Sequence, residues 1–456
     1  MTRQSRFLIF CALILAVASP ACAQWNEQVL YSFQGLPDGA TPTGKIVFDK
    51  QGNLYGVTSE GGSSSCAGPA QCGTVYELSP PTKNGGPWTE TILHVFQGRA
   101  FGDGSTPSGG PVMDAAGNLY GTAAYDGTGP CQLLGGLVGC GVIYEMSPPS
   151  QPGGAWTETV LYNFQGGNDG YFPAGDLVFD KAGNLYGATV FGGGRGVNCG
   201  NSLDQNCGTI FELSPPQQKG GAWTEKVLYS FAGLEPWSVA GDGSQPNGGL
   251  VFDDAGDIYG TAARGGSNIP NCGSSGCGAA FELIPPQKGG AWTENVLYRF
   301  QGAPNDGAGP NGNLVIADGA VYGTTYSGVG GGIFYELSRA RENNQWVMTT
   351  LYTFLGYPNP GNPEGGLTIT EDGDVLGTTI NGGSGFGGAI IRLMPPKAGR
   401  DWGLSDLYNF GRAPAASGPI GELVADGTNK FYGITQVGGT GHACQGGCGT
   451  AYAVSP

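Results

Sequence analysis

The residues best suited to binding chemistry are aspartates that recur in the phrase Asp-Gly-x-x-Pro. The five copies carry Asp38, Asp103, Asp169, Asp242 and Asp306. Gathered at one mouth of a channel, these carboxylates would bind a cation or the hydroxyl groups of a sugar. Asp-Gly is also a turn dipeptide in which the carboxylate caps its own backbone. A calcium loop needs several oxygen ligands where each phrase supplies one, so we favour the turn and keep the five aspartates as candidate ligand contacts.

Aromatic residues accompany these aspartates in the same loops. The loop over residues 233–246 is longer than its counterparts and contains Trp237, and the loops before it contain Phe101, Tyr171 and Phe172. Aromatic side chains beside carboxylates can stack on sugar rings or anchor a protein partner. They can equally pack over the loops as local covers. The sequence leaves both interpretations open, and these four residues join the candidate ligand contacts.

Cysteines occur in close pairs. Beyond Cys11 and Cys22, the pairs are Cys66 and Cys72, Cys131 and Cys140, Cys199 and Cys207, Cys272 and Cys277, and Cys444 and Cys448. Bonding within each pair is the simplest connectivity for an even number of cysteines in a secreted chain. A zinc site needs four converging ligands, and the only histidines are His94 and His442. We therefore predict five local disulfides and no metal site.

Catalytic chemistry has few candidates in this sequence. With two histidines in the chain, a histidine-based nucleophile or general base is not expected. A glutamate recurs once in each of five units in the phrase Tyr/Phe-Glu-Leu/Met, at Glu77, Glu145, Glu212, Glu282 and Glu336. Such repetition indicates a structural partner, because a catalytic residue is expected once. We predict no catalytic residue and no cofactor, although sequence spacing cannot reveal carboxylates paired across a pore.

These residues are set in a sequence that repeats seven times. One phrase begins with tryptophan, as in WTETVLYNF (156–164), and a second is typified by GDLVFDKAGNLYGAT (175–189). The third phrase begins at the second cysteine of each pair, as in CGTIFEL (207–213). Two copies of it, GGIFYEL (331–337) and GGAIIRL (387–393), lack the cysteine and follow short glycine-rich loops. We therefore expect the disulfides to hold the longer loops in place.

Each unit contains four short runs rich in Val, Ile, Leu, Tyr and Phe, bounded by Gly, Pro, Asp and Asn. Such runs indicate strands. Four strands in each of seven units predict an all-β, seven-bladed propeller with four-stranded antiparallel blades. The sequence after residue 24 begins with a lone Trp-led run and ends with the other three runs. The N-terminal strand would therefore join the last blade and close the ring.

The ordered phrases W-x-E-x-[VI]-L-Y-x-F, D-G-x-x-P-x-G, L-V-F-D-x-x-G-N-L-Y-G-T-T and G-T-[VI]-[YF]-E-L-S-P together form one unit. This unit resembles the Gloeo/Verruco-type tandem repeat, a family also described as choice-of-anchor tandem repeat proteins. The match covers nearly all of residues 25–456. The resemblance implies a bacterial protein that is secreted or displayed on the cell surface. It implies no established reaction.

The N-terminal segment indicates export. MTRQSR carries two arginines, a 12-residue apolar run follows, and Ala21-Cys22-Ala23 fits a signal-peptidase site. The run is shorter than the ~20 residues that span a bilayer. We predict a signal peptide over 1–23 and one propeller domain over 24–456, with no transmembrane segment. The alternative is a lipid anchor on Cys22. The product is expected to be a monomer in the periplasm, outside the cell or on its surface.

The net charge and the variable loops limit the classes of function that we expect for this protein. A net charge of −16 would repel phosphate backbones, which argues against nucleic acid. We predict a secreted, non-enzymatic module for binding or scaffolding, with a glycan or protein ligand on the variable loops. The alternative is an extracellular carbohydrate-active hydrolase or lyase that uses loop carboxylates. Acidic residues unique to single blades and converging at one mouth of the pore would favour the enzyme.

Overall fold

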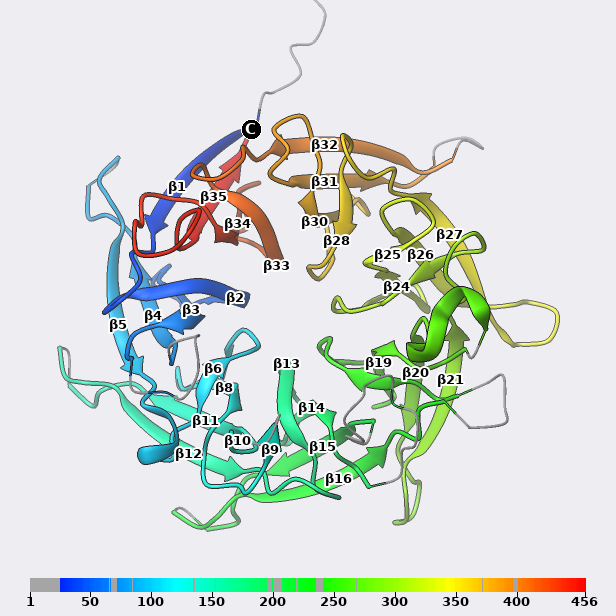
Figure 1. Ribbon diagram of the computed structural model, residues 1–456, viewed down its shortest axis with the longest axis horizontal. Coiled ribbons are helices and arrows are strands. Elements are labelled where there is room, and N and C mark those ends of the chain that lie inside the picture. The colour runs from blue at the N-terminus through cyan, green and yellow to red at the C-terminus, as the bar shows by residue number, and fades with distance from the viewer. Residues whose placement is uncertain are drawn as a thin grey trace, which may run out of the picture.

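The computed structural model describes residues 25–456 except for 65, 67–71, 84, 134–135, 152, 195–198, 200–206, 219, 235–240, 268, 371 and 397–400. Seven antiparallel sheets surround a central axis, with the first strand of each sheet innermost and the fourth outermost (Figure 1). The predicted seven-bladed propeller of four-stranded blades is confirmed. Within the described residues, no helix is long and apolar enough to cross a membrane.

The second, third and fourth strands are regular in every blade. The second strands are β3 (Leu54–Gly61), β8 (Leu119–Tyr125), β14 (Leu185–Phe191), β19 (Ile258–Arg264), β24 (Ala320–Thr324), β30 (Val375–Asn381) and β34 (Phe431–Val437). The third strands are β4 (Thr74–Ser79), β11 (Val142–Ser147), β15 (Thr209–Ser214), β20 (Ala279–Ile284), β26 (Ile333–Arg339), β31 (Ala389–Met394) and β35 (Thr450–Ser455). The fourth strands are β5 (Thr89–Val95), β12 (Thr157–Asn163), β16 (Thr224–Ser230), β21 (Thr293–Arg299), β27 (Trp346–Thr353), β32 (Gly403–Asn409) and β1 (Asn26–Ser32).

The first strands are of two kinds. Three run without a break: β2 (Gly39–Phe48), β13 (Tyr171–Phe179) and β33 (Ser417–Ala425). The other four are interrupted into β6 (Ser105–Pro107) and β7 (Val112–Met113), β17 (Ser244–Pro246) and β18 (Val251–Phe252), β22 (Gly307–Ala308) and β23 (Val315–Ala317), and β28 (Gly361–Pro363) and β29 (Thr368–Ile369). Short elements in the loops are η1 (Gly98–Ala100), η2 (Pro270–Ser275), β9 (Gln132–Leu133), β10 (Gly136–Leu137) and β25 (Ser327–Gly328).

The ring closes through the N-terminal strand, as predicted. β1 pairs with β35 in an antiparallel register in which Asn26 lies opposite Ser455, and the last blade has the order β1-β35-β34-β33. In Figure 1 the blue β1 lies beside the red β35. Closure in this way supplies the fourth strand of the last blade and ties the first strand of the chain to the last.

Aromatic residues of the fourth strands join each blade to both of its neighbours. Phe33 at the end of β1 is fully buried, and its ring lies 4.9 Å from that of Tyr76 in the next blade. Trp156, which precedes β12, instead contacts Tyr55 of the preceding blade at 5.7 Å. The tryptophan and the phenylalanine that bracket each repeated phrase therefore pack in opposite directions around the ring, which explains their spacing.

The predicted local disulfides are confirmed, and each cysteine bonds to the partner nearest in sequence. The Cα atoms of the bonded residues lie 4.9 to 5.4 Å apart. The five disulfides join Cys66 with Cys72, Cys131 with Cys140, Cys199 with Cys207, Cys272 with Cys277, and Cys444 with Cys448. Every disulfide therefore lies within a single loop between the second and third strands of its blade.

The second cysteine of each pair also contributes its backbone to the ring. The N–H of Thr106 donates to the carbonyl of Cys72 in the preceding blade at 2.9 Å. The carbonyls of the other second cysteines accept in the same way from Phe172, Gln245, Gly309 and Thr41; these carbonyls belong to Cys140, Cys207, Cys277 and Cys448. In the two blades without cysteines, the carbonyls of Gly331 and Gly387 accept the equivalent bonds from Asn362 and Gly418.

Candidate functional site

The Asp-Gly carboxylates each accept hydrogen bonds within their own turn. Asp38 accepts from the N–H of Gln34 at 2.8 Å and from the hydroxyl of Tyr31 at 3.0 Å. A fourth-strand side chain partners the others in the same way: Asp103 with His94, Asp169 with Tyr162, Asp242 with Tyr229 and Asp306 with Tyr298. The structure thus places each carboxylate in a separate loop as a turn cap. Their role in ligand binding stays a prediction.

A second carboxyl group faces four of these aspartates, and the sequence analysis missed it. Burial, together with the negative charge of Asp38, raises the pKa of Glu90 to about 7. The equivalent pairs are Glu158 with Asp103, Glu225 with Asp169 and Glu294 with Asp242. Each glutamate comes from the Trp-Thr-Glu phrase of a fourth strand. The signal that could have revealed this glutamate is its recurrence two residues after the tryptophan of the repeated phrase. The pairs join neighbouring blades and have a structural role.

The aromatic candidates divide into packed and exposed residues. The ring of Tyr171 lies 5.4 Å from that of Phe191 in its own blade. The ring of Phe172 lies 5.7 Å from that of Phe191 and 4.8 Å from that of Tyr125 in the preceding blade, so both residues are packed. Phe101 is exposed over 67% of its surface. Trp237 lies outside the described residues. No ring contact joins Phe101 to Tyr171 or Phe172, so the three described aromatic residues do not form one site.

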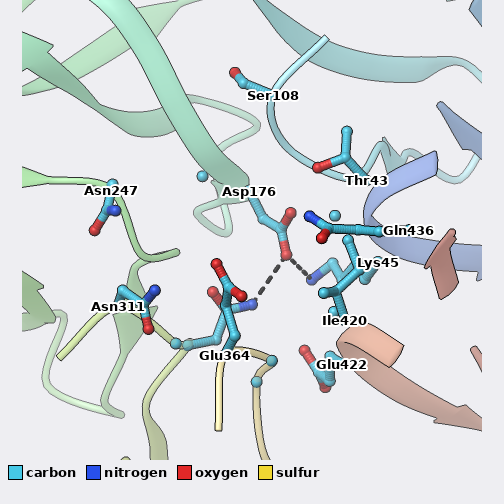
Figure 2. Close-up of a pocket in the computed structure, with 17 residues that line it drawn as sticks. Thr43, Lys45, Ser108, Asp176, Asn247, Asn311, Glu364, Ile420, Glu422 and Gln436 are labelled. Carbon is cyan, nitrogen blue, oxygen red and sulfur yellow. Dashed lines mark hydrogen bonds and ion pairs between the residues drawn. The ribbon is translucent and has the colours of Figure 1, made fainter. Parts of the chain in front are cut away.

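The residues that do come together belong to a phrase that the sequence analysis did not single out. Each first strand contains Pro-x-Gly-z, with z three residues after the proline. In chain order z is Lys45, Gly110, Asp176, Gly249, Asn313, Gly366 and Glu422, and x is Thr43, Ser108, Ala174, Asn247, Asn311, Glu364 and Ile420. Most of these residues line a central cavity of about 170 Å³ (Figure 2).

A bulge in the first strand directs this phrase to the axis. In β2, Thr43 pairs with Val57 and Val47 pairs with Tyr55, so four steps along β2 match two along β3. The extra residues leave the ladder and project away from the sheet. β13 and β33 have the same register shift, and the interrupted first strands of blades two, four and six break at the equivalent place.

Asp176 is the centre of the cavity's polar network. It is 8% exposed, and its Oδ1 accepts from the N–H of Gly110 at 2.6 Å. Its Oδ2 accepts from Nδ2 of Asn313 at 2.9 Å and lies 3.7 Å from Nζ of Lys45. Four different blades therefore meet through one carboxylate. In Figure 2 a dashed line joins Asp176 to Lys45.

Polar residues and glycines alternate at position z. Lys45, Asp176 and Asn313 are separated by glycines, and the side chain of Asn313 occupies the space above Gly249. The N–H of Gly249 donates to Oδ1 of Asn313 at 2.7 Å, and a Cβ on Gly249 would lie 2.5 Å from that oxygen. The glycines thus leave their backbone amides accessible to the polar side chains of the next blade.

The glycines at the third position of the phrase close the centre of the ring. They are Gly44, Gly109, Gly175, Gly248, Gly312, Gly365 and Gly421. A Cβ on Gly365 would lie 2.2 Å from the carbonyl oxygen of Gly421, and one on Gly421 would lie 2.1 Å from that of Gly44. Neighbouring backbones therefore touch at the axis with no room for a side chain between them.

The charges in the cavity are coupled. Burial alone would lower the pKa of the Lys45 ammonium, but the carboxylates of Asp176 and Glu422 outweigh it and raise that pKa. Burial raises the pKa of the Glu364 carboxyl. Burial also raises the pKa of Glu422, against the opposing effect of Lys45. The cavity therefore combines an ammonium group, the carboxyl group of Asp176 and two carboxyls that protonate more readily than exposed ones.

Two side-chain amides at the cavity wall have unsatisfied oxygens. Oδ1 of Asn247 and Oδ1 of Asn311 are buried and have no partner among the described residues. Both line the cavity beside Glu364. Within the described part of the chain, no group of three or more His, Cys, Asp or Glu side chains is placed to hold a metal ion. The arrangement suits a ligand that donates hydrogen bonds to amide and carboxyl oxygens.

Comparison with known proteins identifies a family. The model described as the Gloeobacter/Verrucomicrobia repeat matches residues 19–269, 131–391 and 269–456. A search of curated protein sequences finds no significant match.

Several solved structures share the architecture. An ulvan lyase from a new family of polysaccharide lyases, bound to a saccharide of glucuronic acid and sulfated rhamnose, has a TM-score of 0.54 at 9% identity over 93% of this chain and 95% of its own. The periplasmic gluconolactonase of Pseudomonas aeruginosa has a TM-score of 0.45 at 12% identity over 79% and 83%. The PQQ-bound aldose sugar dehydrogenase of Streptomyces coelicolor has 0.42 at 14% identity over 95% and 98%. At these identities the likeness concerns the fold alone.

Proposed function

The chain belongs to the Gloeobacter/Verrucomicrobia repeat family, and from that premise we propose that it is a secreted binding module whose ligand is a hydroxyl-rich group held at the centre of the propeller. One observation carries the proposal. Within the Pro-x-Gly-z phrase, the residues at positions x and z differ from blade to blade, and most of them line a single cavity. Repeats that serve only to build the ring would have no need of a different polar side chain in each blade.

The chemistry of the lining supports a sugar hydroxyl as the group that is bound. Asn247 and Asn311 offer amide oxygens without partners, and Glu364 offers a carboxyl group. Each hydroxyl of a sugar donates one hydrogen bond and accepts others, so it matches amides and carboxyls together. The cavity of about 170 Å³ has the volume of roughly six waters in the liquid, at ~30 Å³ each, which suits a single sugar residue at the end of a chain.

Thermal-shift measurements with simple sugars test this function. A ligand that binds only the folded state raises the melting temperature. We expect glucose, galactose, mannose or glucosamine, at millimolar concentration, to raise the melting temperature of the mature protein. We expect glucuronate to have no effect, because its carboxylate would meet Glu364 and Glu422. The shift should be lost in Glu364→Gln and in Asn311→Ala.

A matched control uses a glutamate far from the axis. Glu342→Gln removes an exposed carboxyl group and should leave the sugar-dependent shift unchanged. Absence of a shift with every sugar, or an equal loss of the shift in Glu342→Gln, would contradict the proposed function.

The second candidate function is an extracellular carbohydrate-active hydrolase or lyase. It is supported by the convergence of Asp176, Glu364 and Glu422, each unique to one blade, on the same cavity. A carboxyl with a raised pKa can act as a general acid at neutral pH. Incubation with polysaccharides, followed by assays for reducing ends and for unsaturated products, tests this function. Activity that Glu364→Gln or Glu422→Gln abolishes would establish the enzyme over the binding module.

A further inference from the structure

Three loops of the fifth, sixth and seventh blades form an exposed aromatic stack. Tyr357 lies in the loop between β27 and β28, Phe386 in the loop between β30 and β31, and Arg412 in the loop after β32. The loops that hold Tyr357 and Arg412 lack the Asp-Gly phrase, and the loop that holds Phe386 lacks the cysteine pair. The stack therefore occurs where the repeat has lost both of its usual loop-fixing devices.

The geometry of the stack is that of three layers. The rings of Tyr357 and Phe386 lie 5.3 Å apart with an angle of 29° between their planes. The guanidinium carbon of Arg412 lies 4.7 Å from the centroid of the Phe386 ring. Tyr357 is 68% exposed and Phe386 is 40% exposed. The tyrosine ring is thus supported from one side by Phe386 while most of its surface faces solvent.

The backbone at Phe386 is strained to maintain this arrangement. Its φ of +65° lies in the left-handed region, where a bulky side chain is an outlier. The N–H of Phe386 donates to the carbonyl of Gly383 at 3.0 Å, which closes a tight turn. Glycine would adopt this conformation without strain. Strained residues of this kind concentrate at functional sites, and here the strained turn presents an aromatic ring to Tyr357.

The same loops carry side-chain amides. Nδ2 of Asn381, at the end of β30, donates to Oδ1 of Asn362 at 3.2 Å, and both groups are exposed. Oδ1 of Asn409, at the end of β32, accepts from the N–H of Ser384 at 3.0 Å. Amides both donate and accept hydrogen bonds, and the exposed Arg412 adds further donors. The surroundings of the stack therefore include the polar groups that sugar hydroxyls need.

We propose that Tyr357, held by Phe386 and Arg412, is a stacking platform for a sugar ring of a neutral polysaccharide. The electron-rich face of an aromatic ring attracts the polarised C–H groups on the flat side of a pyranose. Nucleobases would also stack on a tyrosine, but the net charge of −16 repels the phosphates that accompany them. The platform is separate from the central cavity, because its residues belong to loops and not to the Pro-x-Gly-z phrase.

Affinity electrophoresis of the mature protein tests the platform. Native gels containing laminarin, xyloglucan, galactomannan or pullulan serve as the probes. We expect at least one of these polysaccharides to retard the protein. Tyr357→Ala should weaken the retardation about tenfold or more, whereas Tyr357→Phe, which keeps the ring, should retain it. Phe386→Ala should weaken it as well, because the tyrosine loses its support. Circular dichroism verifies the fold of each variant.

Leu355 provides the matched control for stacking. It is 67% exposed and lies two residues before Tyr357, but it has no aromatic face. Leu355→Ala should leave retardation unchanged. Retardation by none of the four polysaccharides would overturn the platform. So would an equal loss in Leu355→Ala, which would indicate an apolar docking surface for a protein. Loss in Glu364→Gln alone would assign polysaccharide binding to the central cavity instead.

Discussion

Four tyrosines of the third strands are completely buried, with hydroxyl groups that have no hydrogen-bond partner among the described residues: Tyr76, Tyr144, Tyr335 and Tyr452. Each hydroxyl lies above a glycine of the second strand, and a Cβ on Gly121 would lie 2.4 Å from the hydroxyl of Tyr144. Phenylalanine occupies the equivalent positions at Phe211 and Phe281, where it is also fully buried. The hydroxyl is therefore not needed to fill the core.

We expect Tyr144→Phe to increase the free energy of unfolding by about 1 kcal/mol, because it removes a buried hydroxyl that lacks a partner. Urea denaturation measures the change. Tyr162→Phe is the matched control, since the hydroxyl of Tyr162 donates to Asp169 at 2.9 Å. Its loss should decrease the free energy of unfolding by about 1 kcal/mol. Equal effects of the same sign in the two variants would contradict this account.

At the scale of the element, the loop between the second and third strands has two tasks. Its disulfide closes the loop, and the backbone of its second cysteine accepts a hydrogen bond from the next blade. The disulfides also lie against the loop that leads into the next blade: a Cβ on Gly98 would lie 2.7 Å from Sγ of Cys66. In the two blades without cysteines, a glycine carbonyl accepts the hydrogen bond from the next blade. This interblade hydrogen bond therefore does not require the disulfide.

The double variant Cys66→Ala/Cys72→Ala should lower the free energy of unfolding by about 2 kcal/mol, since the short closed loop constrains the unfolded chain. Urea denaturation under non-reducing conditions measures this loss. The intact mass of the wild-type protein should be lower than that of its fully reduced form by the mass of ten hydrogens. For the double variant, which keeps four disulfides, the difference should be eight hydrogens. A variant as stable as the wild type would show that this disulfide does not stabilise the protein.

At the scale of the whole molecule, contacts that recur around the ring decide its stability. The third-position glycines bring seven backbones together at the axis, and each Glu–Asp pair joins a fourth strand to the loop that follows the neighbouring fourth strand. In the last blade, whose loop lacks the aspartate, Oε2 of Glu27 accepts directly from the hydroxyl of Tyr408 at 2.9 Å. We therefore expect the stability of the ring to depend on the close approach of backbones at its centre and on the protonation of carboxyls near its rim.

A single methyl group at the axis should disturb the ring. Gly365→Ala would place its Cβ 2.2 Å from the carbonyl oxygen of Gly421, and a backbone cannot move aside as a flexible side chain can. We expect a loss of about 1–3 kcal/mol in the free energy of unfolding. Gly411→Ala is the control, because its Cβ would meet only the Cβ of Ala415 at 3.1 Å. Comparable losses in the two variants would contradict the importance of the axial contact.

Stability should fall as the pH rises from about 5 to 9. The pKa of Glu90 and of Glu158 is about 7 and that of Glu294 about 8 in the folded state, against 4.5 ordinarily. The folded state thus binds protons more tightly, and the stabilisation present below the ordinary pKa is lost as the pH passes the folded pKa. The groups that face these glutamates are Asp38, His94, Asp103, Asp242 and Arg299.

Melting temperatures measured across this pH range check the expectation. Glutamine keeps an N–H donor where the protonated glutamate has an O–H, and it does not ionise. The triple variant Glu90→Gln/Glu158→Gln/Glu294→Gln should therefore show a flatter pH dependence and a higher melting temperature than the wild type at pH 9. A wild-type melting temperature that rises over the range, or a variant with the same slope, would contradict the role of these pairs.

The sequence by itself determined the architecture of this protein. Alternation within each strand, turn dipeptides and cysteine pairs are local, and seven ordered copies repeat them, so the strands, the disulfides and the ring closure could all be predicted. The Asp-Gly and Tyr-Glu-Leu phrases attracted attention because they repeat, yet Asp38 and its counterparts prove to cap turns.

Only the tertiary structure decided which residues meet at the axis. Lys45, Asp176 and Glu422 lie far apart in the chain, and each occupies a position that is glycine in other blades. Nothing local marks them, because their proximity arises from closing the ring. Likewise, Tyr357, Phe386 and Arg412 come from three separate loops. Their stacking depends on the angle between adjacent blades, a quantity set by packing across blade interfaces.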